Sequence, residues 1–165
     1  MRVLFVCLGN ICRSPSAQGV FQKLLAHSEL ASLVEVDSAG TADYHVGKPP
    51  DRRAIAAASR RGVDISRLSA RRVADSDFAE FDLILAADHS NLLELLRRAP
   101  AHCAAKIRLF MSYAPHDAEE IPDPYYGGEQ GFEDVLDMLE RASQGLLASL
   151  GEGASVTTAC QPCST

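Results

Sequence analysis

Residues 3–15 read VLFVCLGNICRSP, an apolar run that stops at a cysteine and passes into small and polar residues. Ser14 is a natural helix N-cap and Pro15 suits the first helical position. The stretch therefore predicts a strand, a short loop and a helix in direct succession. Ligands bind at such loops in open α/β sheets, and the amides that open a helix attract anions. Arg13 adds a two-pronged donor suited to phosphate oxygens.

Cys7 is expected at the base of this loop, where a helix N-terminus and Arg13 both favour a thiolate. A thiolate beneath a bound phosphate can attack phosphorus and form a phosphocysteine. Gly9 permits close approach of the backbone, Asn10 tolerates left-handed torsions, and the Ser14 hydroxyl can donate to the sulfur. A plain alternative is that Cys7 is a small buried hydrophobic residue.

The rest of the chain alternates apolar runs with helical patterns. Continuous runs are typical of parallel strands buried on both faces, and they predict strands at Val3–Val6, Leu33–Val36, Phe81–Ala86 and Ile107–Phe110. Apolar residues at helical spacing predict helices around residues 17–25, 55–61, 91–98 and 132–150. This alternation indicates a three-layer α/β fold.

Composition limits the class of protein. The 165 residues, 47% of them hydrophobic, suit one domain over 1–150, and a small polar segment at 151–165 is expected to be a flexible tail. A net charge of −6 argues against general nucleic-acid binding. Without a membrane span or a signal-peptide pattern, we expect a cytoplasmic location and reduced cysteines. The Cys160/Cys163 pair is interpreted as incidental, with redox or metal work as the alternative.

A phosphate-ester leaving group needs a proton, and the candidate acid lies in residues 119–128, EEIPDPYYGG. Pro122 and Pro124 stiffen the chain around Asp123. Tyr125 and Tyr126 are flat side chains suited to line an aromatic substrate. Asp123 could instead be an ordinary turn residue.

Residues 7–17, CLGNICRSPSA, together with DPYYG at 123–127, resemble the low-molecular-weight protein tyrosine phosphatases. The similarity extends through DSAGT at 37–41, GKPP at 47–50 and DHSN at 88–91. The resemblance implies a four-stranded parallel sheet with helices on both faces, the phosphotyrosine phosphatase I-like fold. It implies Cys7 as nucleophile, Arg13 as phosphate clamp and Asp123 as general acid and base, with no cofactor and no metal. It also implies a substrate-binding set supported by Ser38: Leu8, Gly9, Asn10, Ile11, Cys12, Ser14, Tyr44, Tyr125 and Tyr126.

The resemblance further implies that Cys12 protects Cys7 by a reversible disulfide after oxidation; simple loop packing is the alternative. Leu68 stands where many relatives carry a histidine that supports the loop asparagine. Either another residue supports Asn10 here, or that support is weaker.

Three other functions are compatible with the phosphate-binding pattern. Relatives that hydrolyse phosphoarginine carry threonine at the place of Ile11, whose apolar side chain favours an aromatic ring. Arsenate reduction would need further cysteines near the site, for which Cys103 and the Cys160/Cys163 pair are the candidates. An anion-binding module could dispense with both Cys7 and Asp123.

The expected partner is a phosphotyrosine-bearing protein, with a tyrosine autokinase among the candidates, and the product is inorganic phosphate. We expect no nucleic-acid or membrane partner, and a monomer or weak self-association.

Overall fold

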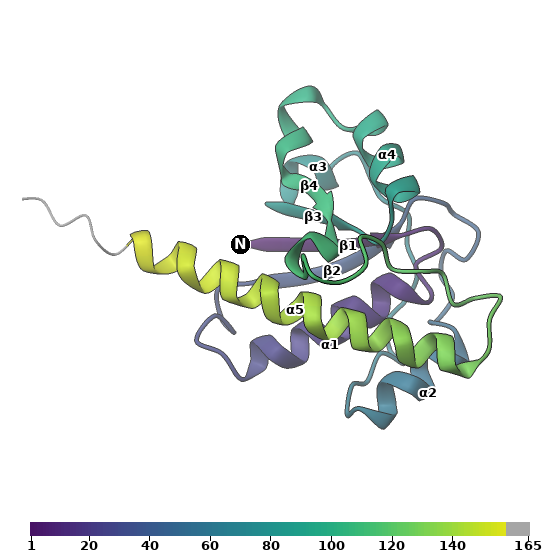
Figure 1. Ribbon diagram of the computed structural model, residues 1–165. Coiled ribbons are helices and arrows are strands. Elements are labelled where there is room, and N and C mark those ends of the chain that lie inside the picture. The colour runs from purple at the N-terminus through teal and green to yellow at the C-terminus, as the bar shows by residue number, and fades with distance from the viewer. Residues whose placement is uncertain (158–165) are drawn as a thin grey trace, which may run out of the picture.

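The computed structural model describes residues 1–157, in which four parallel strands form one sheet in the order β2-β1-β3-β4 (Figure 1). The elements are β1 (Arg2–Cys7), α1 (Arg13–Ala26), β2 (Glu35–Gly40), α2 (Arg52–Arg60), α3 (Asp77–Glu80), β3 (Leu83–Ala86), α4 (His89–Arg98), η1 (Ala101–Lys106), β4 (Ile107–Leu109), η2 (Phe110–Tyr113) and α5 (Glu129–Thr157). Helices α1, α2 and α5 lie on one side of the sheet and α3 and α4 on the other (Figure 1). The predicted three-layer fold is confirmed.

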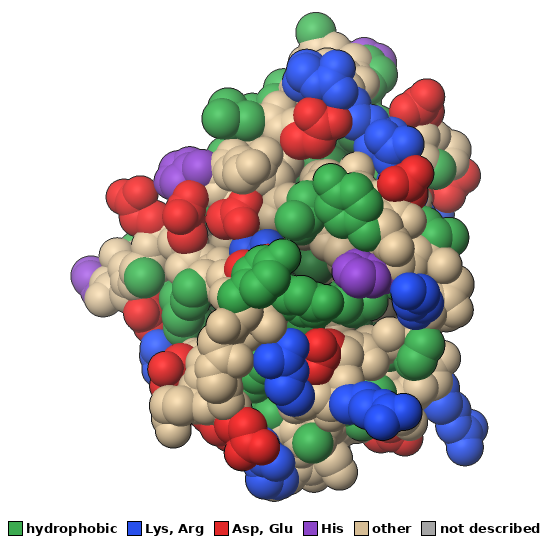
Figure 2. Space-filling model, turned by 90° about the vertical axis from the view of Figure 1, so that its right-hand side faces the viewer, with side chains coloured by type: hydrophobic (Ala, Val, Ile, Leu, Met, Phe, Trp, Pro, Cys, Tyr) green, Lys and Arg blue, Asp and Glu red, His purple; other side chains and the backbone are tan. Residues whose placement is uncertain are grey.

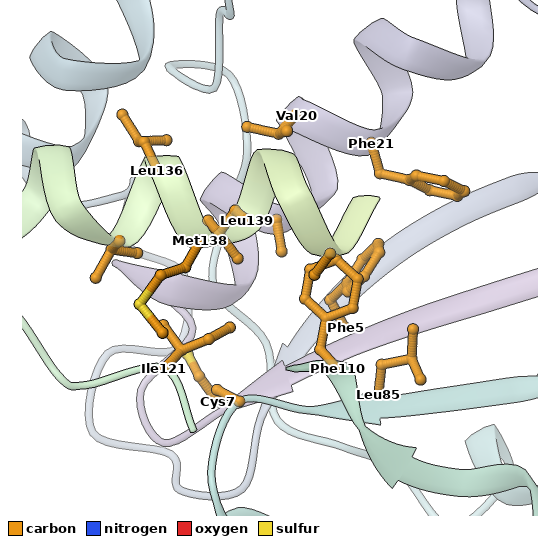
Figure 3. Close-up of a cluster of buried hydrophobic side chains, with 14 of the residues drawn as sticks. Phe5, Cys7, Val20, Phe21, Leu85, Phe110, Ile121, Leu136, Met138 and Leu139 are labelled. Carbon is orange, nitrogen blue, oxygen red and sulfur yellow. The ribbon is translucent and has the colours of Figure 1, made fainter. Parts of the chain in front are cut away.

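The two faces of β1 build two separate cores, because successive side chains of a strand point to opposite faces. Val3, Phe5 and Cys7 belong to the cluster that α1, α2 and α5 cover. Leu4 and Val6 belong to the cluster beneath α3 and α4. Burial on both faces explains why β1 reads as a continuous apolar run. In Figure 3 the first cluster reaches Cys7 beside Ile121, so the thiol stands where the core meets the loops.

The position of β1 sets the position of the site. The chain passes from β1 to β2 on one side and then to β3 on the other, so the strand order reverses between β1 and β3. In open α/β sheets a ligand crevice forms at the carboxyl ends of the strands at this reversal. Residues 8–12 follow β1 and Asp88 follows β3, so both segments leave the sheet at this crevice.

Several predicted strand boundaries are wrong, including that of β3, which begins at Leu83 rather than Phe81. The second strand is Glu35–Gly40 rather than Leu33–Val36, and Leu33 is 59% exposed in the turn before it. Because β2 is an edge strand with one neighbour, it accommodates the polar residues Asp37 and Ser38. These polar residues interrupt the apolar run, so the sequence pattern did not predict a strand over them. Phe110 opens η2 instead of ending β4.

Helix α5 continues through Thr157, so the boundary expected at residue 151 falls inside this helix. Cys160 and Cys163 lie outside the described residues. Among the helices described through residue 157, none is both long enough and apolar enough to cross a membrane.

Candidate active site

Residues 7–13, here called the phosphate loop, join the end of β1 to the start of α1. The carbonyls of Cys7, Leu8 and Ile11 accept hydrogen bonds from the amides of residues 41, 42 and 51. Within the described chain, none of the amides of residues 8–12 donates to another protein group. The carbonyls of this loop accept hydrogen bonds from neighbouring segments, whereas its amides have no protein acceptor among residues 1–157. Such a loop is suited to bind a tetrahedral anion with its amides.

The conformation of the phosphate loop depends on two residues, one within the loop and one on β2. Asn10 has a φ of 54°, in the left-handed region that asparagine tolerates better than most residues. Gly40, at the end of β2, lies directly against the loop. A Cβ atom at residue 40 would stand 2.7 Å from the carbonyl oxygen of Leu8 and 3.2 Å from the amide nitrogen of Asn10. The loop thus packs backbone to backbone on β2.

Helix α1 begins at Arg13, and its N-cap is Cys12, which makes no side-chain capping bond. The predicted N-cap role of Ser14 and the first helical position of Pro15 are therefore wrong. The Ser14 hydroxyl is used elsewhere: it lies 3.0 Å from the sulfur of Cys7 and 3.3 Å from the carbonyl oxygen of Ala39. The first-turn amides of α1 consequently receive no capping oxygen from Ser14, which suits an anion site.

Cys7 is 3% exposed, and the orientation of Ser14 toward it is fixed by Asn10. The Asn10 amide group donates to the Ser14 oxygen at 2.8 Å. With its oxygen accepting from Asn10, the hydroxyl directs its one hydrogen to the sulfur or to Ala39, and the sulfur is nearer. A thiolate at residue 7 thereby gains a charge-assisted hydrogen bond.

Hydrogen bonds to three groups hold Asn10. They show what supports Asn10 in a chain that has leucine, not histidine, at residue 68. Its amide group also donates to Ser38 at 3.0 Å, and its side-chain oxygen accepts from the backbone amide of Arg71 at 3.0 Å. Ser38 in turn donates to the buried Gln18 at 2.7 Å. Leu68 itself packs against the apolar core. Ser14, Ser38 and Arg71 therefore supply the support that the family resemblance leads one to expect from a histidine at residue 68.

The side chain of Arg13 is only 4% exposed, and three groups contact its guanidinium. Its guanidinium donates to Asp88 at 2.6 Å and to the carbonyl of Ile121 at 3.0 Å, and it lies 3.5 Å from Asp123. Burial alone would lower the pKa of Arg13, but the charges of Cys7, Asp88 and Asp123 outweigh it and raise that pKa above its ordinary value. Arg13 is therefore a fixed cation with a defined orientation.

Asp123 stands on the acid loop, defined as residues 122–128, between β4 and α5. Its Oδ1 accepts from the amide of Tyr125 at 3.1 Å, and its Oδ2 faces Arg13. The side chain is 39% exposed, so it remains open to solvent and to a ligand.

Cys7, Arg13 and Asp123 line one cleft of about 310 Å³. The face that carries it is hollowed and ringed by hydrophobic side chains (Figure 2). Its other lining residues are Leu8, Gly9, Ile11, Cys12, Tyr44, His45, Tyr125 and Tyr126. The side chains of Asn10, Ser14 and Ser38 do not line it and are buried.

Cys12 lines the same cleft as Cys7 and is 5% exposed. Burial is the main cause that raises the pKa of the Cys12 thiol to about 12, followed by the charges of Asp51, Cys7 and Asp123. Cys12 is thus a protonated thiol at neutral pH.

Sequence reasoning missed several contributors to the site. Asp88 and Ile121 hold Arg13, Gln18 stands behind Ser38, and His45 lines the cleft. The segment DHSN at 88–91 was a signal for Asp88, because it follows a strand at the sheet edge where the ligand crevice forms. In residues 1–157, no three His, Cys, Asp or Glu side chains are grouped to hold a metal ion.

Comparison with known proteins agrees with this geometry. The family model described as low molecular weight phosphotyrosine protein phosphatase matches residues 2–156. A low molecular weight protein-tyrosine-phosphatase of Streptomyces coelicolor is 46% identical over 155 residues, covering 92% of this chain and 94% of that protein. The human low molecular weight phosphotyrosine protein phosphatase is 45% identical over 147 residues, covering 88% and 92%.

Among solved structures, a protein tyrosine phosphatase of Entamoeba histolytica, with Hepes in its active site, superposes with a TM-score of 0.90 at 43% identity. The match covers 93% of this chain and 99% of that one. The chain belongs to the low molecular weight phosphotyrosine protein phosphatase family, and it is a hydrolase of protein phosphotyrosine.

Proposed function

We propose that Cys7 is the nucleophile of this phosphatase, that Arg13 and the loop amides bind the phosphoryl group, and that Asp123 is the general acid and base. The observation that carries the proposal is the meeting of these three side chains in one cleft, with the Cys7 sulfur 3.0 Å from the Ser14 hydroxyl. The Hepes in the Entamoeba relative adds support, because its sulfonate is a tetrahedral anion.

The proposed reaction has two displacements at phosphorus. The Cys7 thiolate forms an S–P bond while the bond from phosphorus to the phenolic oxygen breaks, and that oxygen takes the proton of the Asp123 carboxyl. In the second step the Asp123 carboxylate takes a proton from water, whose oxygen attacks phosphorus. The S–P bond breaks, inorganic phosphate is formed, and the thiolate returns, stabilised by the hydrogen of Ser14.

The shape of the cleft supports an aryl phosphate as the substrate. Tyr44, Tyr125 and Tyr126 line it, and Ile11 adds an apolar wall. Flat aromatic side chains favour an aromatic ring, whereas an apolar Ile11 offers no polar partner to the guanidinium of phosphoarginine. We propose the side chain of a phosphotyrosine-bearing protein, with a tyrosine autokinase among the candidates.

The position of Cys103 argues against arsenate reduction. Cys103 is buried in the cluster beneath α3 and α4, where its thiol donates to the carbonyl of Phe78 at 3.3 Å. Cys7 and Cys12 belong to the cluster on the opposite face of the sheet. A thiol relay from Cys7 to Cys103 would therefore have to cross the sheet.

We also propose reversible protection of Cys7 by Cys12. Peroxide would convert the thiolate to a sulfenic acid with release of hydroxide, and the Cys12 thiol would then displace water from the sulfenic acid to close a disulfide. The charge of Cys7 contributes to the raised pKa of Cys12. Oxidation would remove that charge and with it one of the smaller causes of the raised pKa of Cys12, whereas burial, the largest cause, would remain. We propose a reducing compartment such as the cytoplasm, because the proposed nucleophile Cys7 must stay a free thiol for turnover.

Two variants test the proposed roles. Cys7→Ser should abolish turnover of p-nitrophenyl phosphate while retaining phosphate binding, and rapid acid quench of the wild type should trap a phosphocysteine. Asp123→Ala should slow turnover by roughly 10²–10⁴-fold for poor leaving groups and by less for acidic ones. Turnover by Cys7→Ser would contradict the nucleophile. A loss in Asp123→Ala that is equal across leaving groups would contradict the acid.

A substrate-trapping experiment can identify the physiological substrate. An Asp123→Ala variant should retain phosphotyrosine proteins from a lysate of the native host, and inorganic phosphate or vanadate should release them. Phosphoarginine offered to the wild type should be turned over far more slowly than phosphotyrosine.

A further inference from the structure

The acid loop is held firmly at its start but weakly at Asp123. The amide of Ile121 donates to the carbonyl of Ala87 at 2.8 Å, which fixes the chain just before the loop. Among the described hydrogen bonds and ion pairs, Asp123 meets the phosphate loop through one contact, with Arg13 at 3.5 Å, which is at the limit of a hydrogen bond. The bond between Tyr125 and Asp123 is internal to the acid loop and cannot fix its place.

Arg53, near the start of α2, supplies the missing attachment. Its guanidinium donates to the carbonyl of Tyr125 at 2.9 Å and to the carbonyl of Gly127 at 3.3 Å. It also lies over the rings of Tyr125 and Phe132, 5.6 Å and 4.8 Å from their centroids. Arg53 therefore holds the acid loop at two carbonyls and contacts the first turns of α5.

Arg53 is itself oriented by Asp51, the N-cap of α2. The Asp51 carboxylate accepts from the Arg53 backbone amide at 2.8 Å and from two guanidinium nitrogens at 3.1 Å and 3.0 Å. A planar guanidinium paired in this two-pronged way has a fixed plane, unlike an ammonium group. Nη1 and the second hydrogen of Nη2 are then directed to the carbonyls of the acid loop.

The same residue pair is attached to the phosphate loop. The backbone amide of Asp51 donates to the carbonyl of Ile11 at 2.8 Å. A continuous path of hydrogen bonds therefore runs from the phosphate loop through Asp51 and Arg53 to the carbonyls of the acid loop. The two halves of the site meet through this path, although Arg53 does not line the cleft.

We propose that Arg53 is a positioning residue for Asp123, which sets the distance between the proposed acid and the phosphate loop. The proposal rests on the proposed acid role of Asp123. It concerns one step of the reaction: Arg53 touches neither the phosphoryl group nor Cys7, so its loss should impair protonation of the leaving oxygen and leave phosphate binding intact.

The test compares Arg53→Met, Arg53→Lys and the control Arg52→Met. Arg52 is the exposed neighbour on α2, and its replacement removes the same charge; none of its contacts described in residues 1–157 reaches the acid loop. Each variant is assayed on p-nitrophenyl phosphate, phenyl phosphate and phosphotyrosine, with inhibition by inorganic phosphate measured in parallel. Thermal unfolding checks that each variant is folded.

For Arg53→Met we expect kcat/KM to fall about tenfold more on phenyl phosphate and phosphotyrosine than on p-nitrophenyl phosphate, a fraction of the full effect of a general acid. Inhibition by phosphate should change by less than about twofold, since the donors to the phosphoryl group are retained. Arg53→Lys should fall between Arg53→Met and the wild type, because an ammonium cannot reach both carbonyls and Asp51 together. This milder variant also serves if Arg53→Met does not fold.

Equal losses on all three substrates, no loss, or the same pattern in Arg52→Met would overturn the proposal. Failure of the proposed function looks different. In that case Cys7→Ser would still turn over p-nitrophenyl phosphate, or Asp123→Ala would show no dependence on the leaving group.

Discussion

The Ser14 hydroxyl offers the sharpest test of the proposed nucleophile. Ser14→Ala removes the hydrogen that the Asn10 contact directs toward the Cys7 sulfur at 3.0 Å. A hydrogen bond to a charged group has a net value of about 1.5–3 kcal/mol, which corresponds to about 10- to 150-fold in rate. Because the sulfur is the leaving group of the second step, the loss should fall chiefly on breakdown of the phosphocysteine.

The assay is rapid-mixing turnover of p-nitrophenyl phosphate. In Ser14→Ala, a fast release of one equivalent of p-nitrophenol should precede a steady rate about 10- to 150-fold below that of the wild type. Ser38→Ala is the matched control, since it also takes an acceptor from Asn10 but has no contact with Cys7 among the described hydrogen bonds. A folded Ser14→Ala with a wild-type steady rate, or an equal loss in Ser38→Ala, would refute the reasoning.

Three further outcomes follow from the geometry. Asp88→Asn should lower the free energy of unfolding by about 1.5–3 kcal/mol, because it removes the charge paired with the buried Arg13; urea unfolding measures this, and unchanged stability would contradict it. The hydrogen bond from Arg53 lowers the pKa of Asp51 below its ordinary value, so this carboxylate stabilises the fold above pH ~4 and the contribution is lost as the pH falls through the lowered value. Asp51→Asn should therefore flatten the acid side of a plot of unfolding midpoint against pH, whereas an unaltered slope would speak against it. Cys12→Ser should keep its turnover but fail to regain activity with thiol after a pulse of peroxide, and full recovery would exclude the proposed disulfide.

The sequence predicted what depends on neighbours along the chain. The apolar run before Cys7 predicts a buried strand, and the phosphate loop follows from the order strand, loop, helix. Asp123 could be proposed as the acid from the sequence, because a phosphate-ester leaving group needs a proton donor and the chain has a stiff acidic loop near the same edge of the sheet. The Ser14 prediction failed because a local rule for capping competes with a distant partner: the hydroxyl is used by Cys7, seven residues earlier.

What the sequence could not predict is set by pairs that are far apart in the chain. Asp88 is 75 residues from Arg13, and Arg53 is 72 residues from Tyr125. No pattern of spacing identifies which of many charged residues will meet. The predicted position of β2 was wrong for a related reason. The polar residues of this strand face neighbours that only the fold brings together. Ser38, for example, points to Asn10 and Gln18.

Gly40 carries no chemistry, yet β2 can lie under the phosphate loop only if residue 40 has no side chain. In a library of all single substitutions selected for activity, residue 40 should tolerate as few replacements as the proposed nucleophile Cys7. A survey that equates intolerance with catalysis would then misassign it. Activity therefore depends on Gly40 because its backbone packs against the phosphate loop, and not because it contacts the substrate.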